Sequence, residues 1–568
     1  MRPFRLYTLL SQRKRRLTRR GKSFRQRLAR SSLGIGAALS LCLMIAIIYL
    51  GILYANLTAD LPSLEQLPVL LNPDDGLLLE PTRLYDRSEQ HLLLTLENTG
   101  IPRRYLFVNP DQPDHFSPRL IQVSVALLDP DFWKSPGFAW GNLTEPKPIT
   151  MAETLVDELL LQDEPPGALR PLRMHLLAAQ VVAQFGRTQV LEWYLNSAYF
   201  GHLAFGAESA AQLYLGESAS DLDLAEVALL VALIETPALN PLDAPAAALE
   251  RQQEVLDRLE ESGSYNDQEI IAARQTVLSI QTTPEPQPFA AEDFSNLVLN
   301  QLDELLTLRR LERGGLRVIT TLDFEMQNQL FCAIKVQLQR LEGNQAADFL
   351  QDIQGCEAAL LLPTFFPPDP PYPEDLMANA IMLDPKTGQV LALLGETTVD
   401  GKKNITVTYE PGSLLSPFIA MSAFAHGMGP STLIWDIPVD ISSDNNNSET
   451  LSGFQNPDGN YHGPIRLRMA LANDYVLPLA RLMSQIGSTG VLRLAEPLGW
   501  NNLSGDDDNA TNSLLFEGGS VRLTEIAQAY STFANQGNVN GWPSSHYSSL
   551  QANTILRVEN LAGQWLLE

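Results

Sequence analysis

Residues 194–216 read YLNSAYFGHLAFGAESAAQLYLG, and they lie in a longer segment, from about Pro118 to Arg258, where apolar residues recur at helical spacing. The clearest predicted helices of this segment are Leu172–Phe185, Gln189–Leu195 and Leu224–Leu233. Asp221 or Asp223 is a plausible N-cap for the third of them. The run TPALNPLDAP, at 236–245, then interrupts the pattern. The segment therefore predicts a helical domain.

Toward the N-terminus, Leu33–Ala55 is a run of 23 residues without a charge. About 20 residues suffice for a helix to cross the hydrocarbon core of a bilayer. Arg and Lys are frequent before this run, so the positive-inside rule places residues 1–32 in the cytoplasm as a basic tail. A cleaved signal peptide is the alternative, although its apolar region would be shorter. We expect a single-pass membrane helix at 33–55, with the bulk of the chain extracytoplasmic.

The charge of the chain is unevenly divided. Twelve of the 40 Lys and Arg residues lie within residues 1–30, which contain no acid, so the rest of the chain sets 28 basic residues against all 66 acidic ones. Such an acidic chain is a poor electrostatic match for nucleic acid. We therefore expect the membrane as a partner and no nucleic acid.

Toward the C-terminus the pattern changes. Residues 246–312 are helical and highly charged, with the polar run TTPEPQP as a hinge. Beyond it, LRVITTLD (316–323) and ANAIMLDPKTGQVLALLG (378–395) alternate and carry β-branched residues, with DPKTGQ as a turn between two strands. A Pro-rich insert at 363–375 and the polar run SSDNNNSE read as loops, and 523–534 reads as a helix. An α/β domain is therefore expected after the helical one.

Cysteine and histidine spacing limits the chemistry. Cys42 lies in the membrane run, so only Cys332 and Cys356 could pair outside it, and the sequence leaves that pairing open. The seven His residues are scattered and form no metal-site spacing. We expect no metal and no cofactor.

The opening stretch resembles the E-x-Y-L-N-x-x-x-F-G-x-x-x-x-G-x-x-x-A-A motif of the family 51 peptidoglycan glycosyltransferases. The matching residues are Glu192, Tyr194, Asn196, Phe200, Gly201, Gly206, Ala210 and Ala211. GGLRVITTLDFEMQNQ, LDPKTGQVLALLG, EPGSLLSPF and LTEIAQAYSTFANQG resemble, in order, the linker and transpeptidase domain of the bifunctional (class A) penicillin-binding proteins. The resemblance covers roughly residues 80–560.

This resemblance implies an α+β multidomain fold. After the membrane helix we expect a lysozyme-like α-helical glycosyltransferase domain at 56–250 and a helical linker at 251–315. A C-terminally incomplete α/β domain of the transpeptidase type, similar to the serine β-lactamases, is expected at 316–568.

The glycosyltransferase motifs are degenerate. The family's carboxylate base in E-D-x-x-F-x-x-H-x-G aligns with Leu128, and its His with Ser135, although Asp129 is kept. Leucine cannot accept a proton, so Asp129 is the candidate catalytic residue that remains, and a displaced base loses on the order of a hundredfold in rate. Asp131, Glu153 and Glu192 are other carboxylates that could be recruited.

The cation of the family's second motif aligns with Asp157, next to Glu158, which reverses the charge where a pyrophosphate would sit. In the third motif, R-K-x-x-E, Met174 replaces the carboxylate and Arg173 could still meet a phosphate. Arg173, Glu192 and Asn196 are therefore candidate substrate-binding residues. For Glu192 and Asn196 a packing or capping role is the favoured interpretation.

The transpeptidase motifs are degenerate as well. In S-x-x-K the serine attacks and the lysine takes its proton. PGSLLSP supplies Ser413 as the candidate nucleophile, but Ser416 stands at the lysine position. The S-x-N motif falls on 474–476 without a match, and the K-T-G at 386–388 precedes Ser413 in a strand turn. Losing one such group costs about 10² to 10⁴ in rate.

Two functional hypotheses follow. The first is a catalytically impaired, membrane-anchored relative in peptidoglycan biogenesis that binds or scaffolds lipid-linked precursor, glycan strands or other cell-wall synthesis proteins. The second is an active glycosyltransferase that polymerises lipid-linked disaccharide-peptide with relocated carboxylates. A third reading, a sensor that a β-lactam acylates at Ser413, lacks a base.

Overall fold

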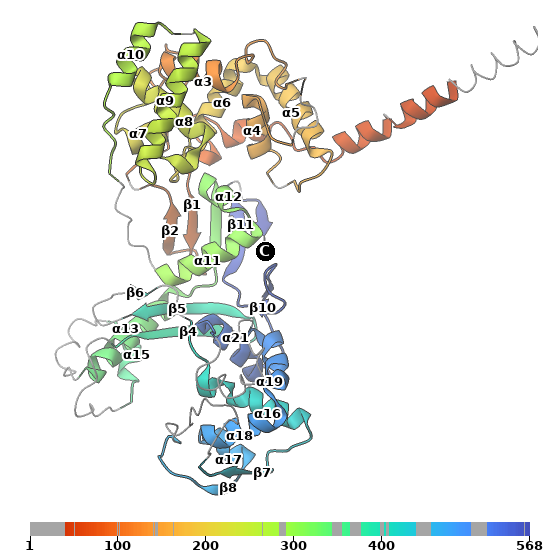
Figure 1. Ribbon diagram of the computed structural model, residues 1–568, viewed down its shortest axis with the longest axis vertical. Coiled ribbons are helices and arrows are strands. Elements are labelled where there is room, and N and C mark those ends of the chain that lie inside the picture. Colours follow the sequence, from red (N-terminus) through yellow and green to blue (C-terminus); the bar gives the residue numbers. More distant parts are fainter. Residues whose placement is uncertain are drawn as a thin grey trace, which may run out of the picture.

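The computed structural model describes residues 40–567 except 50, 99, 102, 140, 142–145, 163, 264, 283–290, 343–354, 364–375, 398–402, 405–407, 439–455, 501–519 and 562. The basic tail, residues 33–39, the polar run 442–449 and most of the TTPEPQP and Pro-rich segments lie outside the described residues. The rest forms two lobes joined by a sheet, with an N-terminal helix that projects from the first lobe (Figure 1).

The projecting helix is Ser40–Thr58, at the red end of the chain in Figure 1. Its side chains are exposed to the surroundings, and by length and composition it could cross a membrane. Among the described residues it is the one helix that is long and apolar enough to cross a membrane. It overlaps the predicted span at 33–55.

The first lobe is helical. Its elements are α2 (Gln66–Leu70), η1 (Leu77–Leu79), α3 (Pro118–Leu128), α4 (Met151–Leu159), α5 (Arg170–Phe185), α6 (Arg187–Ser197), α7 (Ala207–Tyr214), α8 (Leu224–Glu235), η3 (Pro237–Leu239), α9 (Pro245–Ser262) and α10 (Asp267–Gln275). Helix α8 is apolar on every side and buried from Leu224 to Leu233 except at Glu226, so it forms the centre of the lobe. Asp223 is its N-cap, in a capping box with Glu226.

The fold-deciding stretch contains a glycine that the packing requires. Gly201 has φ +92°, and a Cβ at this position would lie 2.3 Å from the carbonyl oxygen of Pro237. No other residue fits both the backbone conformation and the space. Packing and backbone conformation therefore explain why the motif has glycine at position 201 in this chain.

A five-stranded sheet joins the lobes. Its strand order is β12-β11-β3-β1-β2, from β12 (Trp565–Leu567), β11 (Ile555–Asn560), β3 (Leu316–Thr320), β1 (Thr82–Tyr85) and β2 (Leu92–Leu96). β1 and β3 are parallel, with Arg83 opposite Arg317, and β11 pairs with β3 in the antiparallel sense. The helices α11 (Glu292–Leu305) and α12 (Leu308–Arg313) pack beside it. Strands from both ends of the chain therefore meet in one sheet.

The second lobe carries the predicted strand pair, β4 (Ala378–Asp384) and β5 (Gln389–Thr397), which are antiparallel and joined by the DPKTGQ turn. Its other elements are α13 (Phe324–Leu341), α15 (Glu357–Leu360), β6 (Lys403–Asn404), η4 (Gly412–Leu415), α16 (Ser416–Ala425), β7 (Leu433–Asp436), β8 (Gly463–Arg466), α17 (Leu467–Ala472), α18 (Val476–Ile486), α19 (Ser488–Ala495), η5 (Glu496–Leu498), α21 (Leu523–Ala534), β9 (Trp542–Pro543) and β10 (Leu550–Gln551). Helix α21 has the bounds that the sequence predicts.

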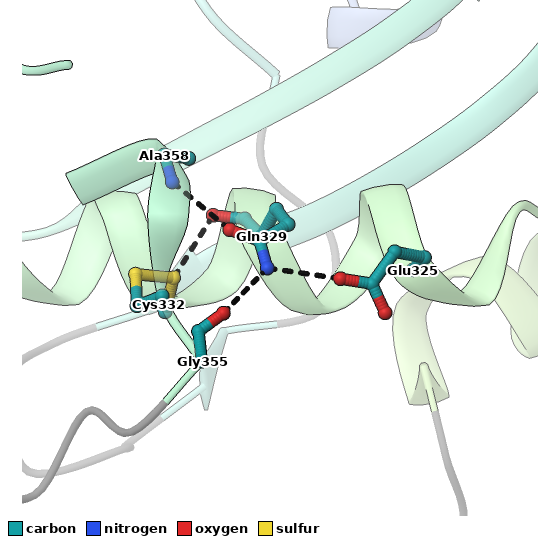
Figure 2. The surroundings of a disulfide bond; sticks show 6 residues. Glu325, Gln329, Cys332, Gly355 and Ala358 are labelled. Atoms are coloured by element: carbon teal, nitrogen blue, oxygen red, sulfur yellow. Dashed lines mark hydrogen bonds between the residues drawn. A yellow bond between two sulfur atoms is a disulfide. The ribbon is translucent and has the colours of Figure 1, made fainter. Parts of the chain in front are cut away.

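A disulfide between Cys332 and Cys356 ties α13 to the start of α15, with a Cα–Cα distance of 6.0 Å. Figure 2 shows Gln329 beside it, on α13. The Gln329 amide donates to Gly355 O at 2.7 Å and accepts from the Ala358 N–H at 3.0 Å. The pairing that the sequence left open is therefore present.

Candidate functional sites

Asp129 is the C-cap of α3 and lines a cavity of about 520 Å³ together with Leu128, Lys134 and Phe138. The residue is 5% exposed, and its Oδ2 accepts a hydrogen bond from the Met151 N–H at 3.2 Å. Burial raises the pKa of Asp129 to about 6; the charges of Glu153 and Asp131 also raise it, and the Met151 N–H opposes the shift. Asp129 is thus a carboxyl group that titrates closer to neutrality than usual, at the wall of a cavity.

Glu153 serves the framework of this cavity. It is fully buried and accepts hydrogen bonds from the N–H groups of Ala139, Ile149 and Thr150, at 2.8 to 3.2 Å. His175 Nδ1 lies 2.8 Å from its Oε1. Because these contacts use both carboxylate oxygens, Glu153 connects the two walls of the cavity and is not a free base.

The acidic pair on α4 is neutralised by arginines. Asp157 forms an ion pair with Arg170 at 2.7 Å. Glu158 forms one with Arg313 of α12 at 3.0 Å, and Arg309 of the same helix lies 3.7 Å away. Asp157 and Glu158, the predicted charge reversal, are therefore paired with arginines of α5 and α12.

Arg173 contacts the chain just after the projecting helix. Its Nη2 donates to Ala59 O and Asp60 O at 3.1 and 3.0 Å, and its Nη1 lies 3.3 Å from Glu164. Arg173 does not line the Asp129 cavity, and Met174 is part of the lobe's core. The structure therefore does not bring Arg173 together with Asp129.

Glu192 and Asn196 fasten residues 105–108 to α6. Glu192 accepts hydrogen bonds from the Tyr105 hydroxyl at 2.7 Å and the Val108 N–H at 2.9 Å. The Asn196 side chain accepts from the Leu106 N–H at 2.9 Å and donates to Leu106 O at 2.8 Å. Each carboxylate and amide oxygen that would meet a substrate is thus engaged inside the lobe.

In the second lobe, Ser413 lies in the 3₁₀ turn η4, which leads directly into α16. Ser416 begins α16 and is 3% exposed, and its hydroxyl has no hydrogen-bond partner among the described residues. A lysine ammonium would be expected at this point in a working S-x-x-K pair. The neighbourhood of Ser413 therefore offers a buried hydroxyl instead of a base.

Tyr530 of α21 contacts the turn that contains Ser413. The Tyr530 hydroxyl donates to Leu414 O at 2.9 Å, one residue after Ser413. Burial, and then the charge of Asp474, raise the pKa of Tyr530 to about 12.

Lys386 of the K-T-G run lies in the β4–β5 turn, where the Asn540 side chain donates a hydrogen bond to the Lys386 carbonyl at 2.7 Å.

Sequence reasoning missed the roles of two residues. Lys134 is the cation among the residues that line the Asp129 cavity, and Tyr530 lies beside the Ser413 turn. Both stand inside segments that the resemblance already covered, LDPDFWKSPG and LTEIAQAYSTFANQG, but at positions where no function was assigned. Their positions beside the two sites become visible only in the folded structure, from burial and distances.

Two family models match the chain in the order of the two lobes. Residues 149–260 match the transglycosylase model, and residues 378–542 match the penicillin-binding protein transpeptidase domain. The chain is a relative of the class A penicillin-binding proteins. Glu192, Asn196 and Arg173 fall in the first matched range and Ser413 in the second, whereas Asp129 lies before both.

Individual penicillin-binding proteins match most of the chain. Penicillin-binding protein 1B of Vibrio cholerae is 26% identical, covering 80% of this chain and 56% of that protein. Penicillin-binding protein 1A of Pseudomonas aeruginosa is 25% identical, covering 85% and 68%, and penicillin-binding protein 1C of Escherichia coli is 25% identical, covering 74% and 50%. The chain thus spans from half to about two thirds of these relatives. The crystal structure of penicillin-binding protein 1A from Haemophilus influenzae aligns with a TM-score of 0.42 at 17% identity, covering 86% of this chain and 71% of that one.

The raised pKa of Asp129 gives a testable pH dependence. The native state holds this proton more tightly than the unfolded chain, so Asp129 lowers stability as the pH rises from 3.8, its ordinary value, through about 6. We expect Asp129→Asn to be more stable than wild type by about 1–2 kcal/mol at pH 7.5, and the two to converge near pH 4. Thermal unfolding across this pH range measures it. An equal offset at every pH would contradict the assignment, and Asp111→Asn, at an exposed site, is the control.

Proposed function

We propose that this chain is a membrane-anchored participant in peptidoglycan synthesis that acts by binding or scaffolding and has lost most catalytic power. The observation that carries the proposal is the neutralised acidic pair of α4. Stabilising a departing pyrophosphate requires cationic side chains that are free to contact it. Here Asp157 and Glu158 lie on α4, and Arg170 and Arg313 form ion pairs with them.

The other losses support the same proposal. Leu128 lines the cavity where a base is needed, and Ser416 buries a hydroxyl where a lysine is needed. Members of a catalytic unit do not act independently, so the loss of one removes most of the benefit of the others. Retention of two well-packed lobes without these groups favours a role in binding lipid-linked precursor, glycan strands or other cell-wall synthesis proteins.

The disulfide supports an extracytoplasmic location for the second lobe. Disulfides persist in oxidising compartments and are rare in the cytosol. Cys332 and Cys356 pair on the C-terminal side of the projecting helix, and the Arg-rich residues 1–30 precede it. Both observations fit a cytoplasmic N-terminus with the lobes outside.

One observation favours the second candidate function, an active glycosyltransferase. Asp129 lines a cavity of about 520 Å³ and has a pKa of about 6, as a general base near neutral pH would require. Lys134 supplies a cation on the same cavity. If the chain polymerises glycan, Asp129 is the residue that we expect to act as its base.

A polymerisation assay separates the two functions. Purified full-length chain is incubated with lipid-linked disaccharide-peptide beside an active class A relative, and the glycan products are resolved by size. We expect the rate of wild type to be at least about 100-fold lower than that of the relative. The variants Asp129→Ala and Asp131→Ala are run in parallel, with Asp111→Ala as an exposed control. Polymer that wild type forms and Asp129→Ala loses would overturn the scaffold proposal.

A further inference from the structure

A second, larger cavity is lined by neither Asp129 nor Ser413. It has a volume of about 610 Å³, and its walls come from α11, from β5 and from the start of α21. α11 lies directly above β5 in Figure 1. A volume of this size falls within the usual range for ligand sites. Neither the sequence motifs nor the Asp129 cavity accounts for it.

Asp293 of α11 points at the backbone of β5. Its Oδ2 accepts a hydrogen bond from the Gly395 N–H at 2.9 Å, while its Oδ1 is buried with no hydrogen-bond partner among the described residues. Gly395 permits this approach, because a Cβ there would lie 2.6 Å from Asp293 Oδ1. A buried carboxylate oxygen without a partner is costly, so a cationic partner would be stabilising here.

Glu396 is a second carboxylate on the same cavity. It is 9% exposed, and its Oε1 accepts a hydrogen bond from the Tyr409 hydroxyl at 2.9 Å. Burial and the charge of Glu396 raise the pKa of Tyr409 to about 12, so this hydroxyl remains a donor. Asn379 in turn donates to the Tyr409 oxygen. Glu396 is therefore held in place through its Oε1, while its Oε2 has no hydrogen bond or ion pair with another described residue.

Three carboxylates and one guanidinium line the described part of the cavity. Asp303 also lines it, and none of these three carboxylates takes part in an ion pair within the described part of the chain. Arg522 is the cation of the lining, and its guanidinium is directed to the Tyr547 hydroxyl at 3.5 Å. Six leucines, including Leu297, Leu393 and Leu523, supply the apolar part of the walls. Among the described residues the cavity thus combines apolar walls with an excess of carboxylates over cations.

We propose that this cavity binds an extended peptide segment that carries a lysine or arginine side chain, with the cation between Asp293 and Glu396 and its apolar neighbours against the leucines. Charge complementarity selects this occupant, since a neutral apolar ligand would leave the carboxylates unpaired. The inference gives the proposed scaffolding role a partner chemistry and rests on that role. Peptide binding is measured without glycan polymerisation, so failure of one proposal is distinguishable from failure of the other.

Fluorescence anisotropy with a labelled Leu-Lys-Leu-Lys-Leu amide tests the proposal on detergent-solubilised full-length chain. The matched probe carries acetylated lysines and has the same length and apolar content. We expect the cationic peptide to bind at least about tenfold more tightly than the acetylated one, and its affinity to fall as salt is added. Equal affinities for the two probes would overturn the proposal.

Variants locate the binding on the molecule. Glu396→Gln and Asp293→Asn keep the shape of each side chain and should each weaken the cationic peptide by about tenfold. Glu410→Gln removes the same charge from an exposed neighbour of Tyr409 and should leave the affinity unchanged. If Glu410→Gln weakens binding as much as the other two, general surface charge explains the effect and the proposed site is excluded.

A variant that should stabilise the protein tests the site without the risk that loss of binding reflects misfolding. Asn300 is exposed on α11 and lines the cavity, so Asn300→Lys places an ammonium beside the carboxylates. We expect it to raise the melting temperature and to block the peptide. Ala272→Lys, at an exposed position of α10, adds the same charge elsewhere and should do neither. A melting temperature that is unchanged or lower in Asn300→Lys, with peptide affinity retained, would contradict the site.

Discussion

Replacing Arg313 by alanine should lower the free energy of unfolding of the helical lobe by about 3–5 kcal/mol. Arg313 is 4% exposed, and it donates to both the backbone and the carboxylate of Glu158, the latter at 3.0 Å, and to Gln162 at 3.2 Å. The truncation leaves these acceptors without a donor and removes the positive charge that balances Glu158. Denaturant unfolding, followed by helical circular dichroism, measures the loss.

Arg309 supplies the control for this prediction, because it stands on the same helix and faces the same carboxylate. It is 53% exposed and lies 3.7 Å from Glu158, so Arg309→Ala should cost less than about 1 kcal/mol. The difference between the two losses of unfolding free energy separates the contribution of the buried contact from that of the charge. Similar losses in both would show that α12 contributes through its charge alone and not through the buried contact of Arg313.

Removing the disulfide should have the second-largest effect. The bridge joins residues 24 positions apart, and loop-closure entropy for a loop of this length corresponds to about 3–4 kcal/mol. The double variant Cys332→Ser/Cys356→Ser should therefore unfold at lower denaturant concentration, with the loss confined to the second lobe. Reducing agent should lower the stability of wild type to that of the variant and leave the variant unchanged.

Cys42→Ser is the matched control, since this thiol lies on the projecting helix and takes no part in the bridge. It should behave as wild type with and without reductant. If wild type is insensitive to complete reduction, as measured by thiol counting, the Gln329 contacts to Gly355 and Ala358 must hold α13 and α15 together without the covalent link.

The sequence predicted well those features that are encoded locally. Helices α8 and α21 follow from apolar spacing within about a dozen positions, and Asp223 is one of the two N-caps that the sequence offers for α8. The strand segment at 316–323 is also predicted, and the structure has β3 at Leu316–Thr320, but the sequence does not predict its partners. Thr82–Tyr85 lies more than 200 residues away, and no local pattern specifies which distant strand it meets.

The candidate site divides in the same way. Motif spacing predicts the charge reversal at Asp157 and the missing lysine at Ser416. That Arg313 neutralises Glu158 could not be predicted, because the two residues are 155 positions apart and meet only after the linker has folded against the lobe. The raised pKa of Asp129 likewise depends on burial, which is a property of the folded chain.

The joining sheet also sets an order for folding during synthesis. β1 and β2 are made early, β3 some 220 residues later, and β11 and β12 only near residue 560, so the sheet order β12-β11-β3-β1-β2 cannot be completed until almost the whole described chain has emerged. Until then β3 presents an open edge, which invites pairing with a foreign strand. A chain held at the membrane by its first helix would complete the connection between its two lobes last of all.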